Sequence, residues 1–180
     1  MVVALEGFPG TGKSSVLDIL RDSGFESVPE HVDFLGSIPP IPTTSDEKKR
    51  NHRRFLSVEK ERAEAMSRPA FVDRSFISSI VFNKLLGETY LSEIREEYQE
   101  LVKSETILVP DTVVILRRPI DEVMRVLRSR DGMNDFWIDP GKVSTYYELL
   151  KDELSYWNIS YTVIDNDKSL REVAADVASC

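Results

Sequence analysis

Short apolar runs alternate along this chain with longer segments in which apolar residues recur at helical spacing. The runs of strand type are residues 2–6, 25–28, 70–72, 112–116 and 161–164. Between them, helices are predicted over residues 15–21, 45–66, 76–86, 89–104, 119–128 and 143–157, with a last helix running to the C-terminus. This alternation predicts an α/β domain whose sheet is mostly parallel, with right-handed crossovers.

Residues 33–52 interrupt the pattern with Pro39, Pro40 and Pro42, followed by a charged run. A loop of this length inside a compact domain is either functional or a surface excursion. Two interpretations stay open for it, a solvated loop and a flap over the substrate. The helix that follows is predicted to be capped by Ser45 or Asp46.

The first strand and the first helix enclose a segment that matches G-x-x-x-x-G-K-[ST], the phosphate-binding loop, or P-loop. Its glycines let the backbone curl until successive N–H groups point at one centre, and the helix N-terminus adds partial positive charge there. Lys13 is predicted to reach the terminal phosphates of a nucleotide, and the Ser14 hydroxyl to ligate Mg²⁺. The predicted phosphate-binding residues are Gly7, Gly10, Thr11, Gly12, Lys13, Ser14 and Ser15.

The composition narrows the class of protein further. A chain of 180 residues is predicted to form a single domain over residues 1–180, and its net charge of −8 argues against non-specific binding of nucleic acid. No apolar run is long enough to span a bilayer, and the N-terminus enters the first strand without a visible targeting segment. The lone Cys180 excludes a disulfide within the chain, so we expect a cytoplasmic protein.

Polar residues follow the predicted strands, where ligands bind in parallel α/β sheets. Asp73 ends the third strand and is predicted to hold Mg²⁺ or its water ligands, with capping of the next helix as the alternative. Arg74 is predicted to face the phosphoryl acceptor, and its alternative is a surface ion pair.

An arginine-rich segment follows the fourth strand. Arg125, Arg128 and Arg130 lead into a region with Gly132 and Pro140, and we predict a mobile lid over about residues 125–142. Closing such a lid would bring positive charge over the γ-phosphate. The alternative is an ordinary solvated helix face.

Glu30, which follows the second strand, indicates which chemical group accepts the phosphoryl group. A carboxylate there can take the proton of a hydroxyl acceptor, whereas a phosphate acceptor would call for an arginine. The pattern favours a hydroxyl acceptor, with a polar turn as the alternative for Glu30. Four aromatic side chains could stack on a base or pack in the core, namely Phe34, Phe55, Phe82 and Trp137.

Together these motifs resemble the P-loop nucleoside and nucleotide kinases, specifically the deoxynucleoside kinase and thymidylate kinase group. The resemblance lies in Glu6-Gly7-x-x-Gly10-x-Gly12-Lys13-Ser14, in Asp73-Arg74-Ser75 with Phe82, in Pro119 followed by Arg125, Arg128 and Arg130, and in residues 146–157. It implies a five-stranded parallel sheet of order 2-3-1-4-5, ATP with Mg²⁺, and adenine contacts near Asn166 in the turn after the fifth strand.

Some positions depart from the family patterns. Pro9 stands where thymidylate kinases usually carry a carboxylate, and no arginine follows the second strand, which argues against thymidylate as acceptor. Deoxynucleoside kinases usually have Glu-Pro after that strand, where this chain has Glu30-His31.

The main hypothesis is transfer of the γ-phosphoryl group of ATP to a hydroxyl of a small acceptor, a nucleoside or deoxynucleoside. In it, Lys13, Arg128 and Arg130 stabilise the transferred charge, and Glu30 is the base. A nucleoside monophosphate kinase, a kinase of another small metabolite, and a nucleotide-dependent binding or regulatory NTPase stay open. A homodimer is one option for the oligomeric state, and neither nucleic acid nor a membrane is an expected partner.

Overall fold

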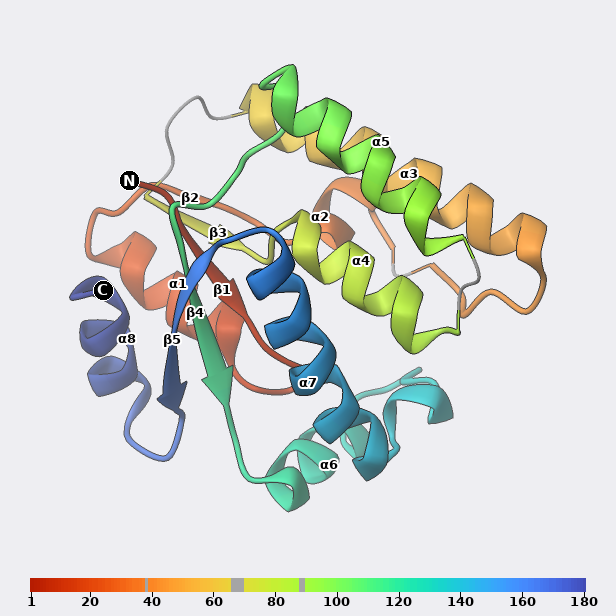
Figure 1. The fold of residues 1–180 in the computed structure, drawn as a ribbon. Helices are drawn as coiled ribbons and strands as arrows, with labels where there is room; N and C mark the ends of the chain where they lie inside the picture. The colour runs from red at the N-terminus through yellow and green to blue at the C-terminus, as the bar shows by residue number, and fades with distance from the viewer. Residues whose placement is uncertain (38, 66–69, 88–89) are drawn as a thin grey trace.

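A computed structural model describes residues 1–37, 39–65, 70–87 and 90–180 of the chain. Its centre is a five-stranded sheet in the order β2-β3-β1-β4-β5, as predicted, with every neighbouring pair parallel (Figure 1). The strands are β1 (Val3–Glu6), β2 (Ser27–Val28), β3 (Phe71–Asp73), β4 (Thr112–Arg117) and β5 (Ser160–Asp165). The carboxyl ends of β1 and β3 therefore lie side by side.

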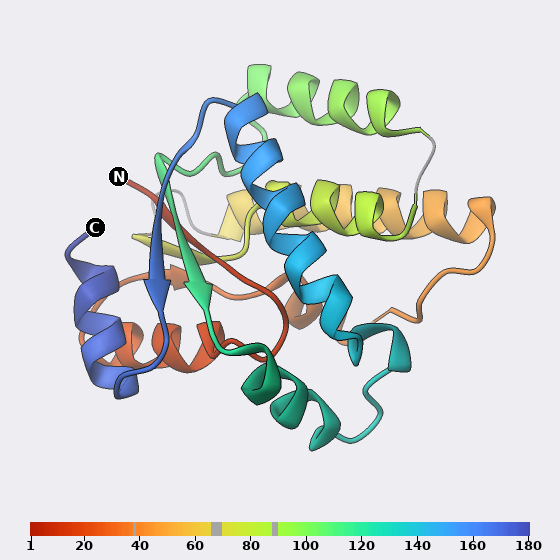
Figure 2. The ribbon, with the colours of Figure 1, turned by 60° about the horizontal axis from the view of Figure 1, so that its bottom comes forward.

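Helices connect these strands and cover both faces of the sheet. They are α1 (Lys13–Asp22), α2 (His31–Leu35), α3 (Ser45–Ala65), α4 (Phe76–Leu85), α5 (Leu91–Lys103), α6 (Ile120–Arg128), α7 (Pro140–Tyr156) and α8 (Leu170–Ala178), with a 3₁₀ turn η1 (Asp135–Trp137) before α7. Figure 2 shows α1 and α8 together on one side of the sheet, with α7 on the other. No helix within the described ranges is both long and apolar enough to cross a membrane.

The two faces of the sheet follow the alternation of side chains along β1. Val3 and Leu5 pack with the apolar residues of α1 and α8, whereas Ala4 joins the larger core under α4 and α7. Because side chains alternate with a period of two, one short apolar strand supplies both cores. This explains why its first three residues are all apolar rather than alternating with polar ones.

Element boundaries shift by a few residues from the predictions. The second strand is shorter than predicted, β3 and β4 each extend one residue further toward the C-terminus, and α7 begins at Pro140 rather than Val143. Asp139 caps α7, because its Oδ1 accepts a hydrogen bond of 2.9 Å from Gly141 N. The end of the helix predicted over residues 45–66 and the first residue of the helix predicted over residues 89–104 lie outside the described residues.

The prediction of one loop over residues 33–52 is wrong. Helix α2 occupies its start and α3 its end, which leaves residues 36–44 between them, with residue 38 outside the description. The cap of α3 is Thr44 rather than Ser45 or Asp46: Glu47 N donates to Thr44 Oγ1 over 3.3 Å, and the Glu47 carboxylate accepts from Thr44 N over 3.2 Å. This reciprocal pair extends the helix into the charged run.

Candidate active site

The P-loop curls around the start of α1 as its glycines require. Gly7, Gly10 and Gly12 have φ of 152°, 89° and 93°, a region that other residues rarely adopt. A Cβ on Gly7 would lie 2.5 Å from the Leu116 carbonyl oxygen, and one on Gly12 would lie 2.7 Å from Asn166 Nδ2. Conformation and close packing therefore both demand glycine at these two positions.

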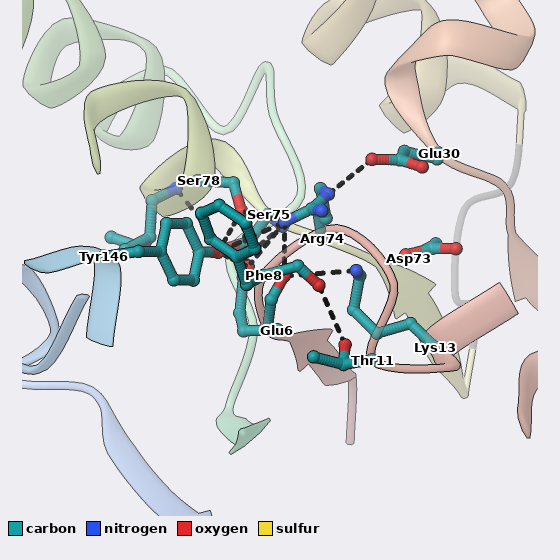
Figure 3. Close-up of polar contacts among 12 residues, drawn as sticks. Glu6, Phe8, Thr11, Lys13, Glu30, Asp73, Arg74, Ser75, Ser78 and Tyr146 are labelled. Atoms are coloured by element: carbon teal, nitrogen blue, oxygen red, sulfur yellow. Dashed lines mark hydrogen bonds and ion pairs between the residues drawn. The ribbon is translucent and has the colours of Figure 1, made fainter. Parts of the chain in front are cut away.

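Lys13 lies inside this loop and points toward its centre (Figure 3). Its Nζ donates a hydrogen bond of 3.1 Å to the Gly7 carbonyl, and burial together with the nearby Arg74 charge lowers the pKa of Lys13 to about 8. A buried ammonium with one carbonyl partner can gain much from anionic phosphates. The geometry fits the predicted role of Lys13 at the terminal phosphates.

Ser14 and Asp73 meet at the mouth of the loop. Ser14 Oγ donates to Asp73 Oδ2 over 3.1 Å, while the buried Asp73 Oδ1 has no hydrogen-bond partner among the described residues. Burial, joined by the neighbouring Glu30 charge, raises the pKa of Asp73. An unpartnered carboxylate oxygen beside a hydroxyl is the kind of donor set that Mg²⁺ accepts, so these residues fit the ion.

The remaining ligands of such an ion would have to come from elsewhere. Among the described residues, no group of three or more His, Cys, Asp or Glu side chains could hold a metal. Mg²⁺ usually binds through one or two protein oxygens together with phosphates and water. The alternative role of Asp73 as a helix cap is wrong, because Ser75 caps α4 by accepting from Ile77 N over 3.3 Å.

Arg74 joins the ends of β1, β2 and β3. Its Nη1 donates to the Gly7 carbonyl over 2.9 Å and to Tyr146 Oη over 3.1 Å, and its Nε donates to Glu30. The residue is buried, with 3% of its surface exposed, so the alternative of a surface ion pair is wrong. Arg74 therefore ties the P-loop to the predicted base.

Glu30 stays ionised in this setting. Burial opposes its charge, but Arg74 and Lys13 outweigh that effect and lower the pKa of Glu30 to about 2. Its side chain is 26% exposed, so one part of the carboxylate faces solvent while the other meets Arg74. An ionised, partly open carboxylate can accept a proton from a bound hydroxyl.

Glu6 is a buried neighbour of the site to which the sequence analysis, although it quoted Glu6 in the resemblance, assigned no role. Its carboxylate is fully buried and accepts hydrogen bonds from Ser75 N (2.8 Å), Ser75 Oγ (2.9 Å), Ser78 Oγ and Tyr146 Oη (3.3 Å). It fixes the segment that follows Asp73 and Arg74 to the end of β1 (Figure 3). A charged residue at the end of an otherwise apolar strand was the available signal.

The predicted lid lies beside the loop but its arginines do not enter the site. Arg125, Arg128 and Arg130 are exposed, and within the described ranges no hydrogen bond or ion pair joins them to the P-loop. Leu127 of α6 packs close to the P-loop, since a Cβ on Gly10 would lie 3.5 Å from it. Movement of the 125–142 segment stays a prediction.

The four aromatic side chains singled out in the sequence pack against other side chains. Trp137 lies edge-on to Phe8 of the P-loop and to Phe82 of α4, with ring centroids 6.0 and 5.2 Å apart. Phe34 also borders the core, and Phe55 stands edge-on to His31 at 5.6 Å. Trp137 thereby connects the predicted lid to the P-loop and to α4.

Asn166 acts on the loop from the end of β5. It is buried, and its Nδ2 donates a hydrogen bond of 2.7 Å to the Thr11 carbonyl. Its predicted contact with adenine stays a prediction. Next to this turn, a cavity of about 390 Å³ is lined by Arg117, Arg118, Pro119, Ile120, Val143, Ser144, Tyr147, Asp165 and Asp167.

Comparisons with known proteins agree with this fold. A family model described as AAA domain matches residues 2–171. No curated protein sequence matches the chain. Deoxyadenosine kinase from M. mycoides with bound dATP superposes with a TM-score of 0.67 and 14% identity, over 99% of this chain and 98% of that one.

Two further solved structures are similar to the same extent. The M. mycoides enzyme with bound dCTP has a TM-score of 0.64 and 16% identity over 100% of both chains. Thymidylate kinase from Candida albicans has a TM-score of 0.66 and 14% identity, over 99% of this chain and 89% of that one. At such identities the likeness establishes a shared fold.

Proposed function

Because the chain belongs to the AAA-domain family and has the fold of nucleoside and nucleotide kinases, we propose that it is an ATP-dependent phosphotransferase. Its acceptor is a hydroxyl of a small molecule, in the first instance a nucleoside or deoxynucleoside. Lys13 and the P-loop amides hold the transferred phosphates, and Ser14 with Asp73 would hold Mg²⁺. The ion supplies positive charge that neutralises the phosphates when it is bound.

The observation that favours a hydroxyl over a phosphate as the acceptor group is the pairing of Glu30 with Arg74. A phosphate acceptor needs donors that are free to bind it, but the Nε and Nη1 of Arg74 already serve Glu30, the Gly7 carbonyl and Tyr146, which leaves only Nη2 of this side chain. A hydroxyl acceptor can use a nearby base, and the Glu30 carboxylate, which Arg74 and Lys13 hold in its ionised form, lies at the end of the second strand with part of its side chain exposed. Its partly exposed carboxylate then takes the hydroxyl proton as the phosphoryl group is transferred.

The test is a panel of acceptors with purified protein, [γ-³²P]ATP and Mg²⁺. Nucleosides and deoxynucleosides, their 5′-monophosphates, and water alone are compared by product chromatography. Labelled nucleoside monophosphate supports the proposal. Labelled diphosphate would instead identify a nucleoside monophosphate kinase, and phosphate release that no acceptor changes would identify an NTPase.

Glu30→Gln tests the base within the same assay. We expect kcat with a hydroxyl acceptor to fall by about 10²–10⁴-fold, the usual contribution of general acid–base catalysis. Glu26→Gln, an exposed carboxylate on the same segment, is the matched control and should keep full activity. Unchanged turnover in Glu30→Gln would refute the role of Glu30.

A further inference from the structure

A cluster of three polar side chains lies sealed beside the carboxyl ends of β2 and β3. His31 begins α2 directly after Glu30, and Glu59 and Arg62 are one turn apart on α3. The exposed fractions of His31, Glu59 and Arg62 are 2%, 1% and 1%. Charges are buried this deeply only when they are paired and hydrogen-bonded.

Within the cluster, Glu59 balances the charge of Arg62. Arg62 Nη1 donates to Glu59 Oε2 over 3.1 Å, and His31 Nε2 contacts the other oxygen of the same carboxylate. Burial opposes ionisation of Glu59, but His31 and Arg62 prevail and lower its pKa. The pairing keeps the guanidinium in place and leaves its second terminal nitrogen for another partner.

That nitrogen reaches the backbone of the candidate active site. Arg62 Nη2 donates to the Asp73 carbonyl over 2.7 Å and to the Arg74 carbonyl over 2.9 Å. Hydrogen bonds from a charged donor are about twice as strong as neutral ones. One buried side chain thus holds two consecutive carbonyls at the end of β3.

The backbone at this point needs such support. Arg74 has φ of 63°, in the left-handed region that is strained for a residue other than glycine. The turn sends the Asp73 side chain toward Ser14 and the Arg74 side chain toward Glu30. A strained conformation persists only where surrounding contacts hold it, and Arg62 provides two of these.

We propose that Arg62 is a positioning residue for phosphoryl transfer, which fixes the Asp73–Arg74 backbone so that Asp73 faces Ser14 and Arg74 faces Glu30. Through Glu59 and His31 it also ties that backbone to the segment that carries Glu30. The inference rests on the proposed function, since it assigns Arg62 to the same site. It adds a buried support on α3, outside the P-loop.

The experiment separates positioning from stability with four variants. Arg62→Met removes the support, and Arg62→Lys keeps a charge with a different shape. Glu59→Met/Arg62→Met removes both partners of the buried pair. Arg53→Met is the matched control, because Arg53 lies on the same helix with its side chain exposed.

Each variant is characterised by its Tm, by its kcat and KM for ATP as separate values, and by the Mg²⁺-dependent rise in Tm with ADP bound. Arg62→Met should lower Tm, because it leaves Glu59 buried without its charge partner. Its kcat should fall by about 10–100-fold, as expected for small misplacements of catalytic groups, while the KM for ATP stays near the wild-type value. Arg62→Lys should lie between Arg62→Met and wild type, and Arg53→Met should match wild type.

The double variant gives the decisive comparison. Replacing a buried ion pair with apolar side chains is often neutral for stability, so Tm should recover toward wild type. Because the two carbonyls still lack their donor, kcat and the Mg²⁺-dependent rise in Tm should stay low. If kcat recovers together with Tm, or if Arg62→Met keeps full kcat, Arg62 is only structural and the inference is wrong.

Failure of the proposed function is a separate outcome. If the wild-type protein transfers phosphate to no acceptor, that function fails, but the Mg²⁺-dependent rise in Tm with ADP needs no turnover. A low rise in the double variant then still supports positioning of Asp73 by Arg62. A wild-type rise in the double variant overturns it.

Discussion

Replacing Gly12 with alanine tests how the P-loop is held, because the chain contains a matched control. Gly12 and Gly24 have nearly the same φ, 93° and 92°. A Cβ on Gly24 would meet nothing within 4 Å, whereas one on Gly12 would lie 2.7 Å from Asn166 Nδ2. Both variants incur the cost of a left-handed alanine, about 1–2 kcal/mol, so their difference isolates the contact with Asn166.

The size of that difference follows from the hydrogen bond that is displaced. Asn166 Nδ2 donates to the Thr11 carbonyl over 2.7 Å, and both groups are buried. Leaving buried polar groups unsatisfied costs about 1–3 kcal/mol. For a domain of this size each kcal/mol lowers Tm by about 2–4 °C, so Gly12→Ala should melt about 2–12 °C below Gly24→Ala.

Differential scanning fluorimetry or calorimetry measures both Tm values, with and without Mg·ADP. Gly24→Ala should keep the wild-type rise in Tm on nucleotide binding, whereas Gly12→Ala should lose most of it. In the Asn166→Ala background, Gly12→Ala should become less destabilising, because the clashing amide is gone. Equal Tm values for Gly12→Ala and Gly24→Ala would refute this account of the P-loop.

Two further predictions concern charge in the site. The pKa of Lys13 is about 8 in the free protein, and bound phosphates should raise it, so affinity for Mg·ADP should fall by about tenfold per pH unit above pH 8. Isothermal titration calorimetry in buffers of different ionisation enthalpy should show that binding of Mg·ADP takes up protons above pH 8. The prediction would be contradicted if no protons are taken up, or if the affinity of Lys13→Met for Mg·ADP falls equally steeply with pH. Glu6→Gln should lower the free energy of unfolding by about 3–5 kcal/mol, because it removes a buried negative charge beside Arg74. Urea denaturation measures that loss against the exposed control Glu100→Gln, and a loss equal to the control would be inconsistent with the buried network.

The elements that sequence analysis predicted well depend on local signals. The P-loop motif indicated both its own conformation and the flanking strand and helix, because its glycines are required by backbone sterics at the loop itself. The alternation of strands and helices led to the parallel sheet, and the family resemblance to its order. The cap of α3 was placed one or two residues late, since Thr44, Ser45 and Asp46 are all suitable capping residues and only the contact with Glu47 distinguishes them.

The sequence by itself determined that this chain forms a parallel α/β domain with a phosphate-binding loop, since strand period, helix period and glycine positions act over a few residues. Only the tertiary structure decided which polar side chains are buried and paired. Glu59 and Arg62 lie in a strongly charged helix, and their burial depends on α3 packing against segments that begin 28 residues before Glu59 and end 12 residues after Arg62. Pairing across such separations is set by the fold, because each charge has many possible partners along the chain and folding buries it beside only a few of them.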